Sequence, residues 1–258
     1  AKAVCGKLLQ ESAIRALVQN IASCDEVWVV SRGAGENLRS LGYEGDYIVM
    51  ENGVDVPRGR VSDEAIAAAT GRYDLPQNVP VFLFVGRLMW YKGIRIILDA
   101  LKTLCEKNVD FRMVFVGEGA DGAEIRSYAE ERKLSDRCFF TGAISDREII
   151  RAWYGRSDLF LFPSTFDTNG LVVREAAASG TATVMIRNSC ASEGVGDGRN
   201  GFCIEENAAA MAAKLEELCR APEVMQVVGE NAQRELYVSW ETAVQRAMAR
   251  YEVVIDNY

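Results

Sequence analysis

Between residues 79 and 204 the sequence alternates short, unbroken apolar runs with longer segments that have helical spacing. The apolar runs read VPVFLFVG, FRMVFVG, CFFTG, DLFLFP, ATVMI and GFCI. The first four are followed by helix-like segments, KGIRIILDALKTLCEKN, AEIRSYAEERK, DREIIRAWYGR and LVVREAAAS. Strands that are apolar along their whole length, and that connect through helices, belong to parallel sheets covered on both faces. The alternation therefore predicts an α/β fold with a Rossmann-like parallel sheet.

The sequence on either side of this alternation predicts a second structural unit. The expected N-terminal elements are a helix over 8–24, a strand over 26–30, a helix over 34–42 that Ser31 caps, and a strand over 47–55 that ends in an Asn-Gly turn. The VPRGR stretch at 56–60 then interrupts the pattern, so we expect a domain boundary there, between 1–55 and 56–258. Three helices close the chain, the last over about 240–258.

Charge and apolar content limit the partners of the chain. It has 258 residues, 49% of them apolar, and 29 Lys and Arg against 37 Asp and Glu, which gives a net charge of −8. An acidic chain is poorly suited to binding nucleic acid through phosphate contacts. No run approaches the ~20 apolar residues of a transmembrane helix, and the amphipathic N-terminus does not read as a signal peptide. We therefore expect a cytoplasmic globular protein that binds no nucleic acid.

The chain contains no histidine, which excludes Ser-His-Asp and Cys-His catalysis within it and all His-based metal sites. Its seven cysteines form no C-x-x-C pair, so they predict reduced residues rather than a zinc site or a disulfide framework. No D-x-D motif is present either. We expect no metal and no cofactor, and a chemistry that uses carboxylates, Lys or Arg, backbone dipoles or the substrate itself.

Four strand-to-helix corners carry unusual residues, and in parallel sheets ligands bind at these corners. In the first, FVGRLMWYKG, Gly86 ends the strand, and Arg87 and Lys92 flank a loop that closes with Gly93. The helix dipole already places positive charge at the start of the next helix, so two cations there favour a dianionic ligand between them. Two solvated surface cations are the alternative.

The second corner, FVGEGADG, fits the dinucleotide pattern G-x-G-x-x-G with Gly117, Gly119 and Gly122. Two features speak against a dinucleotide site. Glu118 would stand beside a pyrophosphate, and the next strand, CFFTG, does not end in the acidic residue that holds a ribose. We interpret the glycines as permitting close backbone approach, to a ligand or within a tight turn. The third corner, FFTGA, predicts only a turn by itself.

The fourth corner, STFDTNGLVVREAAASG, contains two carboxylates at the start of an apolar helix. The backbone N–H groups of Asn169 to Val172 lack partners within that helix. Asp167 precedes Gly170 by three residues and is a helix cap, a favourable partner of the helix dipole, or a ligand contact. Glu175 lies among apolar residues and needs a partner, because burying a lone carboxylate is costly. A ligand's hydroxyl pair is one candidate; Arg174 is another, although adjacent helix positions do not face each other.

Taken in order, these corners resemble the nucleotide-sugar-binding half of retaining glycosyltransferases with two Rossmann-like domains, the GT-B group called family 4. The resemblance extends from about Asp25 onward and rests on FVGRLMWYKG, FVGEG, FFTGAI, PSTFDTNGLVVREAAASGTATV and EGVGDGRNGF. It implies metal-independent transfer of a sugar from a nucleotide-diphosphate sugar to a saccharide or glycolipid acceptor, as in bacterial cell-envelope synthesis. It also implies UDP-sugars as donors in preference to GDP- or ADP-sugars.

The resemblance implies a role for each matching residue. Arg87 and Lys92 would hold the donor diphosphate, and Asp167 would contact hydroxyls of the donor sugar; these are the expected catalytic residues. Glu175 would bind the ribose hydroxyls. The expected donor-binding residues are Gly86, Gly117, Glu118, Gly119, Phe140, Thr141, Gly142, Ala143, Asn169, Gly170, Leu171, Val172 and Glu175.

This sequence departs from the family pattern at two positions. Asp167 replaces the usual Glu and is one methylene shorter, so the preferred donor sugar differs with it. Asn169 stands where Phe is common. The family's acceptor site lies on a separate N-terminal domain, of which residues 1–55 match only the end. We therefore expect a fragment that binds donor without efficient transfer, and whose last helix packs back on the acceptor domain. In the full-length enzyme that domain would also supply any contact with the inner face of the membrane.

Other functions fit parts of the sequence. A nicotinamide-dependent oxidoreductase would rest on GEGADG alone, and a non-catalytic nucleotide-sugar sensor would fit the altered residue at 167. A hydrolysing sugar epimerase or a phosphorylase could share the architecture. The sequence does not decide the oligomeric state.

Overall fold

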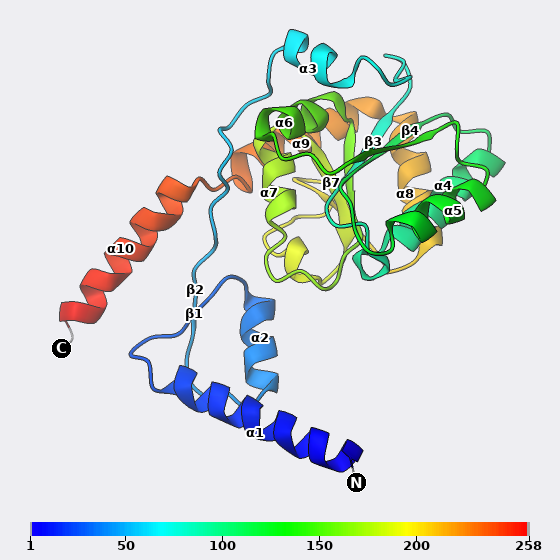
Figure 1. The fold of residues 1–258 in the computed structure, drawn as a ribbon. Coiled ribbons are helices and arrows are strands. Elements are labelled where there is room, and N and C mark those ends of the chain that lie inside the picture. Colours follow the sequence, from blue (N-terminus) through cyan, green and yellow to red (C-terminus); the bar gives the residue numbers. More distant parts are fainter. Residues whose placement is uncertain (1, 257–258) are drawn as a thin grey trace. The chain divides into compact units, whose positions relative to one another are not determined.

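The computed structural model describes residues 2–256. The chain forms two compact units, which we call the sheet unit (Val54–Ser239) and the terminal unit (2–53 with 240–256) (Figure 1). The sheet unit contains the whole strand–helix alternation and is the larger of the two.

Six parallel strands form the sheet, in the order β5-β4-β3-β6-β7-β8. Their bounds are β3 Val81–Val85, β4 Arg112–Val116, β5 Cys138–Gly142, β6 Leu159–Phe162, β7 Ala182–Ile186 and β8 Phe202–Ile204. Strand order reverses between β3 and β6, because β4 and β5 extend the sheet to one side and β7 and β8 to the other. The predicted Rossmann-like fold is confirmed, and the reversal marks the place where such sheets bind ligands.

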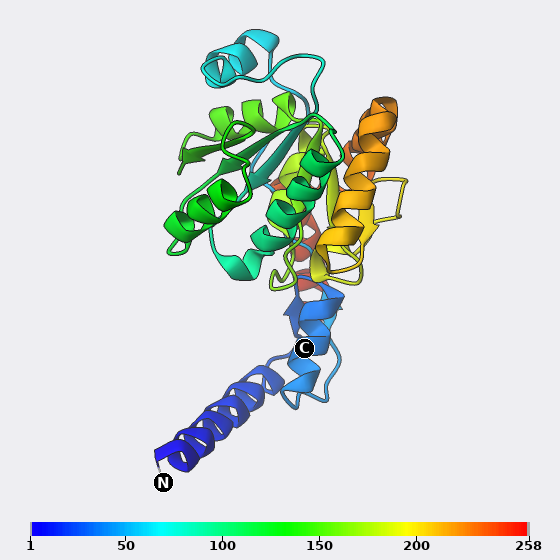
Figure 2. The same cartoon turned by 90° about the vertical axis from the view of Figure 1, so that its right-hand side faces the viewer.

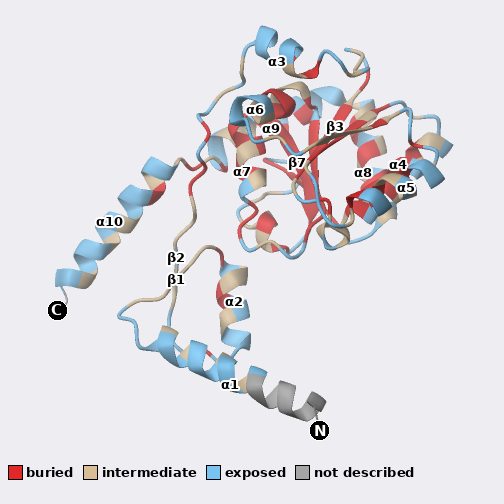
Figure 3. Ribbon diagram, in the orientation of Figure 1, coloured by how far each residue is buried: buried red, intermediate tan, exposed pale blue. Residues whose placement is uncertain are grey.

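Helices cover both faces of the sheet (Figure 2). The bounds are α4 Ile94–Glu106, α5 Gly122–Glu131, α6 Arg147–Arg156, α7 Leu171–Ala178, α8 Ala208–Arg220 and α9 Pro222–Glu235. Phe82 and Phe84 pack in one core with α4, α5 and α8, whereas Val81 and Leu83 pack in another with α6 and α7. Every residue of β3 is buried as a result, which explains why its sequence is apolar without alternation (Figure 3).

Two details of the sheet unit differ from the expectation. Helix α3 (Asp63–Thr70) was not predicted, although Ser62 caps it by accepting from Ala65 N and acidic residues occupy its first turn. The expected helix over 92–108 begins only at Ile94, because Gly93 has φ +75° and ends a separate 3-10 turn, η1 (Trp90–Lys92). Lys92 therefore lies in a tight turn rather than in the α-helix.

The terminal unit consists of α1 (Lys2–Ala22), α2 (Arg32–Ser40) and α10 (Trp240–Asp256) with the short parallel pair β1 (Trp28–Val29) and β2 (Ile48–Val49). Ser31 caps α2 as predicted, accepting from Ala34 N at 3.0 Å. The two strands are shorter than expected, since each pairs with only one neighbour.

Within the terminal unit, α10 contacts strand β1 and the residues just before it. Arg250 Nε donates to Glu26 at 2.8 Å, and the rings of Trp28 and Tyr251 lie 4.9 Å apart. Large apolar side chains of α10 are exposed: Trp240, Val244, Met248, Tyr251, Val253 and Ile255. No helix among the described residues is both long enough and apolar enough to cross a bilayer.

Candidate functional site

The loops that follow β3 and β6 meet at an ion pair. Lys92 Nζ donates to both carboxylate oxygens of Asp167, at 2.7 and 2.9 Å. Gly93 makes this approach feasible, because a Cβ there would lie 2.3 Å from the carbonyl oxygen of Pro163, at the end of β6. The pair therefore joins the two strands between which the strand order reverses. Residues 92 and 167, which are far apart in the sequence, lie together at the expected ligand-binding edge.

Asp167 is held from two sides. Ser164 Oγ donates to Asp167 Oδ2 at 2.5 Å, in addition to the bonds from Lys92. The N-cap of α7 is Gly170, which makes no side-chain capping bond, so the capping alternative for Asp167 is wrong. The side chains of Lys92 and Asp167 are only 12% and 23% exposed, which excludes a fully solvated Lys92. Removing either partner of such a largely buried pair is costly, because the remaining charge would be left unpaired.

Arg87 lies near Lys92 in the loop after β3. Its side chain is exposed, and its guanidinium carbon is 5.9 Å from the centroid of the Tyr91 ring. Lys92 Nζ lies 5.5 Å from the same centroid. The two predicted cations therefore converge on one tyrosine of the corner rather than pointing to separate parts of the surface.

The glycines of the second corner serve backbone packing. Gly86 N donates to Val116 O, and Gly117 N donates to Gly142 O, so the loops after β3, β4 and β5 are joined to one another. A Cβ on Gly117 would lie 1.9 Å from Gly86 O, and Gly117 has φ +138°. A Cβ on Gly119 would lie 2.3 Å from Leu88 O. The glycine spacing is thus explained by close approach of backbones. Glu118 and Gly119 themselves remain exposed at the edge.

The side chains of the third corner have structural partners. Phe140 stacks on Phe115 with centroids 4.8 Å apart, and Thr141 Oγ1 donates to Gly142 O at 2.9 Å. Gly142 has φ +80°, where glycine is favoured. Ala143 is exposed. A ligand at this corner would therefore meet mainly backbone groups.

The N-terminus of α7 is built by a second close approach. Gly170 is left-handed, with φ 60° and ψ 48°, and a Cβ there would lie 2.7 Å from Ala191 Cβ. Leu171 is exposed, and Val172 O accepts from Tyr154 Oη at 3.2 Å. Asn169 is buried, and its Nδ2 has no hydrogen-bond partner among residues 10–256. That amide was expected to act through its backbone only; its side chain is a further donor at this edge.

Glu175 lines a cavity of about 230 Å³ on the α6–α7 side of the sheet, with Val56, Ser145, Arg147, Ile150, Arg151 and Tyr154. Burial raises the pKa of Glu175, and the nearby Arg147 charge and the Tyr154 hydroxyl partly oppose the rise. Tyr154 Oη donates to Glu175 Oε2 at 3.4 Å. Arg174 Nη1 donates to Leu236 O. Sequence analysis missed Arg147 and Tyr154, because both come from a different helix and carry no local signal.

Two thirds of the chain match one protein family. Residues 68–235 fit the model of the glycosyl transferases group 1. The chain belongs to this family. The membership agrees with the resemblance drawn from the corners and places the chain in a different class from the oxidoreductase alternative.

Two curated relatives of the chain have inositol compounds in their names. The D-inositol 3-phosphate glycosyltransferase of Streptomyces avermitilis is 29% identical over 93% of this chain and 54% of its own length. A GDP-mannose-dependent alpha-(1-6)-phosphatidylinositol dimannoside mannosyltransferase of Mycobacterium tuberculosis is 33% identical over 54% of this chain and 35% of its own. The chain thus spans about half the length, or less, of these curated relatives.

Solved glycosyltransferase structures share the fold. The Anabaena protein Alr3699/HepE, solved with UDP-glucose, superposes with a TM-score of 0.82 at 21% identity, over 94% of this chain and 68% of that one.

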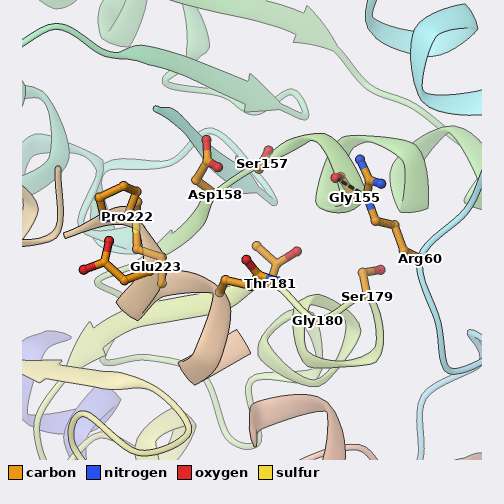
Figure 4. Close-up of a pocket in the computed structure, with 11 residues that line it drawn as sticks. Arg60, Gly155, Ser157, Asp158, Ser179, Gly180, Thr181, Pro222 and Glu223 are labelled. Atoms are coloured by element: carbon orange, nitrogen blue, oxygen red, sulfur yellow. Dashed lines mark hydrogen bonds between the residues drawn. The ribbon is translucent and has the colours of Figure 1, made fainter. Parts of the chain in front are cut away.

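The sheet unit has a second depression at the opposite, amino end of the strands (Figure 4). It measures about 590 Å³, and Arg60, Asp158, Thr181 and Glu223 are among its lining residues. Asp158 accepts from Val81 N at 2.8 Å, and Arg60 Nη1 pairs with Asp63 at 2.8 Å. Asp158 and Arg60 therefore already have protein partners, and the carboxyl end remains the better candidate site.

The raised pKa of Glu175 has a consequence for stability. The folded protein binds a proton here more readily than the unfolded chain, so this group makes stability fall as pH rises from about 4.5 through the folded pKa. Glu175→Gln keeps an acceptor for Tyr154 but removes the charge. We expect the variant's stability to depend less on pH above about 4.5 than that of wild type. At pH 7 we expect the substitution to raise the unfolding midpoint by about 2–4 °C. Thermal unfolding across pH, with the exposed Glu131→Gln as control, checks this; a lower midpoint at neutral pH for Glu175→Gln counts against it.

Proposed function

We propose that this chain binds a nucleoside-diphosphate sugar at the carboxyl ends of β3 and β6, as the donor domain of a retaining glycosyltransferase. The observation that carries the proposal is the Lys92–Asp167 pair across the strand-order reversal, beside the N-terminus of α7. A cation, a helix N-terminus and an exposed guanidinium at one edge favour an anionic ligand. Family membership makes a nucleotide sugar the natural anion.

Each element of the site has a proposed task. Lys92, Arg87 and the N–H groups of Asn169 to Val172 hold the diphosphate. Asp167 leaves part of its bond with Lys92 and accepts from hydroxyls of the sugar. Glu175 accepts from the ribose hydroxyls in the cavity that it shares with Tyr154. The backbone from Phe140 to Ala143 faces the base, and Gly117 to Gly119 border the nucleotide.

The proposed reaction is metal-independent and proceeds on one face of the sugar. The bond between the anomeric carbon and the diphosphate oxygen breaks, while the acceptor hydroxyl forms the new bond on the same face. A diphosphate oxygen takes the acceptor's proton, so no protein nucleophile or histidine is needed. Lys92, Arg87 and the α7 N-terminus stabilise the charge that builds on the leaving diphosphate, which is the term that most lowers such a barrier.

UDP-sugars are the proposed donors. The solved Anabaena neighbour holds UDP-glucose, whereas the Mycobacterium relative is GDP-mannose-dependent, so GDP-sugars are the competing class. Because Asp167 is shorter than glutamate, we propose that the accepted sugar differs from that of relatives with glutamate. Calorimetric titration with UDP-glucose, GDP-mannose and ADP-glucose tests this order; tighter binding of GDP-mannose would reverse it.

The acceptor is proposed to bind on a second domain. The terminal unit would belong to that domain, and the exposed apolar residues of α10, such as Trp240, Met248 and Ile255, would pack on its remainder. By itself the 258-residue chain is then expected to bind donor without efficient transfer. In the whole enzyme the second domain would also make any contact with the cytoplasmic face of a membrane.

Glu175→Ala separates ribose binding from phosphate binding. Two hydrogen bonds to a charged carboxylate are lost, so affinity for UDP is expected to fall about 10- to 100-fold. Affinity for inorganic pyrophosphate, which has no ribose, is expected to stay unchanged. Calorimetry on the variant, with Glu131→Ala as the exposed control, gives both numbers. Equal losses for UDP and pyrophosphate, or no loss for either, would remove Glu175 from the proposed site.

A further inference from the structure

Two exposed aromatic rings lie beside the Lys92–Asp167 pair. Phe166 is 74% exposed and Tyr91 is 37% exposed, and their ring centroids are 5.7 Å apart in an edge-to-face arrangement. Phe166 is the most exposed of the large apolar side chains described in the sheet unit. Each ring comes from one of the two loops that meet at the ion pair, since Tyr91 precedes Lys92 and Phe166 precedes Asp167.

Packing in the core of the sheet unit does not account for the exposed positions of these two rings. A phenylalanine side chain placed in solvent forgoes the free energy that its burial in a core would contribute. Exposed apolar surface gathered at a ligand-binding edge is typical of a contact with a ligand or partner. The side chains of the neighbouring ion pair are only 12% and 23% exposed, so they are much more buried than Phe166.

The surroundings of the rings select the kind of ligand. The cations of Arg87 and Lys92 lie 5.9 and 5.5 Å from the Tyr91 centroid, and the Asp167 carboxylate follows Phe166 directly. A lipid chain would need a continuous apolar surface without charges. A pyranose ring instead has one face of C–H groups, which stacks on an aromatic ring, and a rim of hydroxyls, which bond to charged groups. The pattern of rings bordered by charges matches the sugar.

We propose that Tyr91 and Phe166 form a stacking subsite on the donor domain for one pyranose unit of the acceptor, whose remainder would bind on the second domain. The inference rests on the proposed function, because it places the acceptor sugar just outside the donor. The Lys92–Asp167 pair is mostly buried and would hold the donor sugar. Because Phe166 is much more exposed than this pair, its ring is better placed to contact the acceptor. The two rings would then orient the acceptor hydroxyl toward the bond that breaks, and would help to set which acceptors are used.

Saturation-transfer NMR on the 258-residue chain tests the subsite with two probes in one sample, UDP and methyl α-D-glucopyranoside. For wild type we expect saturation at the ring protons of the pyranoside as well as at UDP. Phe166→Ala is expected to lower the pyranoside signal at least about three-fold and to leave the UDP signal unchanged. Phe166→Tyr should restore the signal, and Val227→Ala, which removes an exposed apolar side chain 55% accessible on α9, should leave both signals intact.

The outcomes separate the two proposals. Absence of a pyranoside signal in wild type, or an equal signal in Phe166→Ala, overturns the subsite whether or not UDP binds. Absence of the UDP signal overturns the proposed function, while the pyranoside signal still reports on the rings. A final arm compares UDP with UDP-glucose by calorimetry. Weaker binding of UDP-glucose alone in Phe166→Ala would assign the rings to the donor sugar and contradict an acceptor subsite.

Discussion

Replacing Lys92 with alanine is expected to weaken UDP binding about 10- to 100-fold. A charge-assisted bond to phosphate contributes about 1.5–3 kcal/mol, and its loss here has a second cost. Asp167, which now accepts from Lys92 at 2.7 and 2.9 Å, would be left as an unpaired anion beside the diphosphate. Calorimetric titration with UDP measures the change. Lys102→Ala is the matched control, because Lys102 forms an exposed pair with Glu106 on α4.

The other half of the pair should behave differently. Asp167→Asn frees Lys92 and removes a negative charge, so UDP is expected to bind at least as tightly as it does to wild type. Binding of the sugar portion should suffer instead, and the advantage of UDP-glucose over UDP should shrink. If both variants lose UDP affinity equally, the ion pair only holds the two loops together, and Lys92 is not a phosphate ligand.

Gly117→Ala is expected to be the most destabilising single substitution that we propose. Its Cβ would lie 1.9 Å from Gly86 O, at a φ of +138°. The loops after β3 and β4 would have to separate, breaking the bonds Gly86 N–Val116 O and Gly117 N–Gly142 O. Strain and lost bonds together predict a cost of about 3–5 kcal/mol, measured by denaturant unfolding.

Gly59→Ala measures the free-energy cost of an alanine at positive φ without the steric clash that Gly117→Ala adds. Gly59 also has positive φ, +120°, but nothing lies within 4 Å of a Cβ there. Its cost should be about 1 kcal/mol, typical of a left-handed alanine. Equal costs at positions 59 and 117 would mean that the close approach of the loops contributes nothing.

Local sequence was enough to predict the sheet, because strands buried on both faces must be apolar throughout. Val81 to Val85 and Leu159 to Phe162 show this directly. The same reasoning placed Lys92 and Asp167 at one edge, since the carboxyl ends of parallel strands meet there. The pairing itself was not predicted, because it depends on Gly93 lying against Pro163 O, a contact between distant segments.

The residues of other elements that surround Glu175 could not be predicted from the sequence. Tyr154 bonds to Glu175 from α6, and the charge of Arg147 on the same helix lowers the Glu175 pKa against the rise that burial causes. No spacing in the chain links those positions to residue 175. Helix α3 was overlooked despite its capping serine, because its short alanine-rich run lacks a clear apolar face. The exposure of Phe166 was not predicted, since the sequence around a loop aromatic does not decide whether its ring is buried.

Hydrogen–deuterium exchange with saturating UDP tests the central claim most directly. We expect slower exchange in peptides that cover residues 86–93 and 167–175, where the diphosphate and ribose would lie. Peptides at the amino-end depression, around Arg60, Asp158 and Thr181, should exchange as they do without UDP. Protection confined to that depression, or no protection in either loop, would contradict a nucleotide site between the ends of β3 and β6.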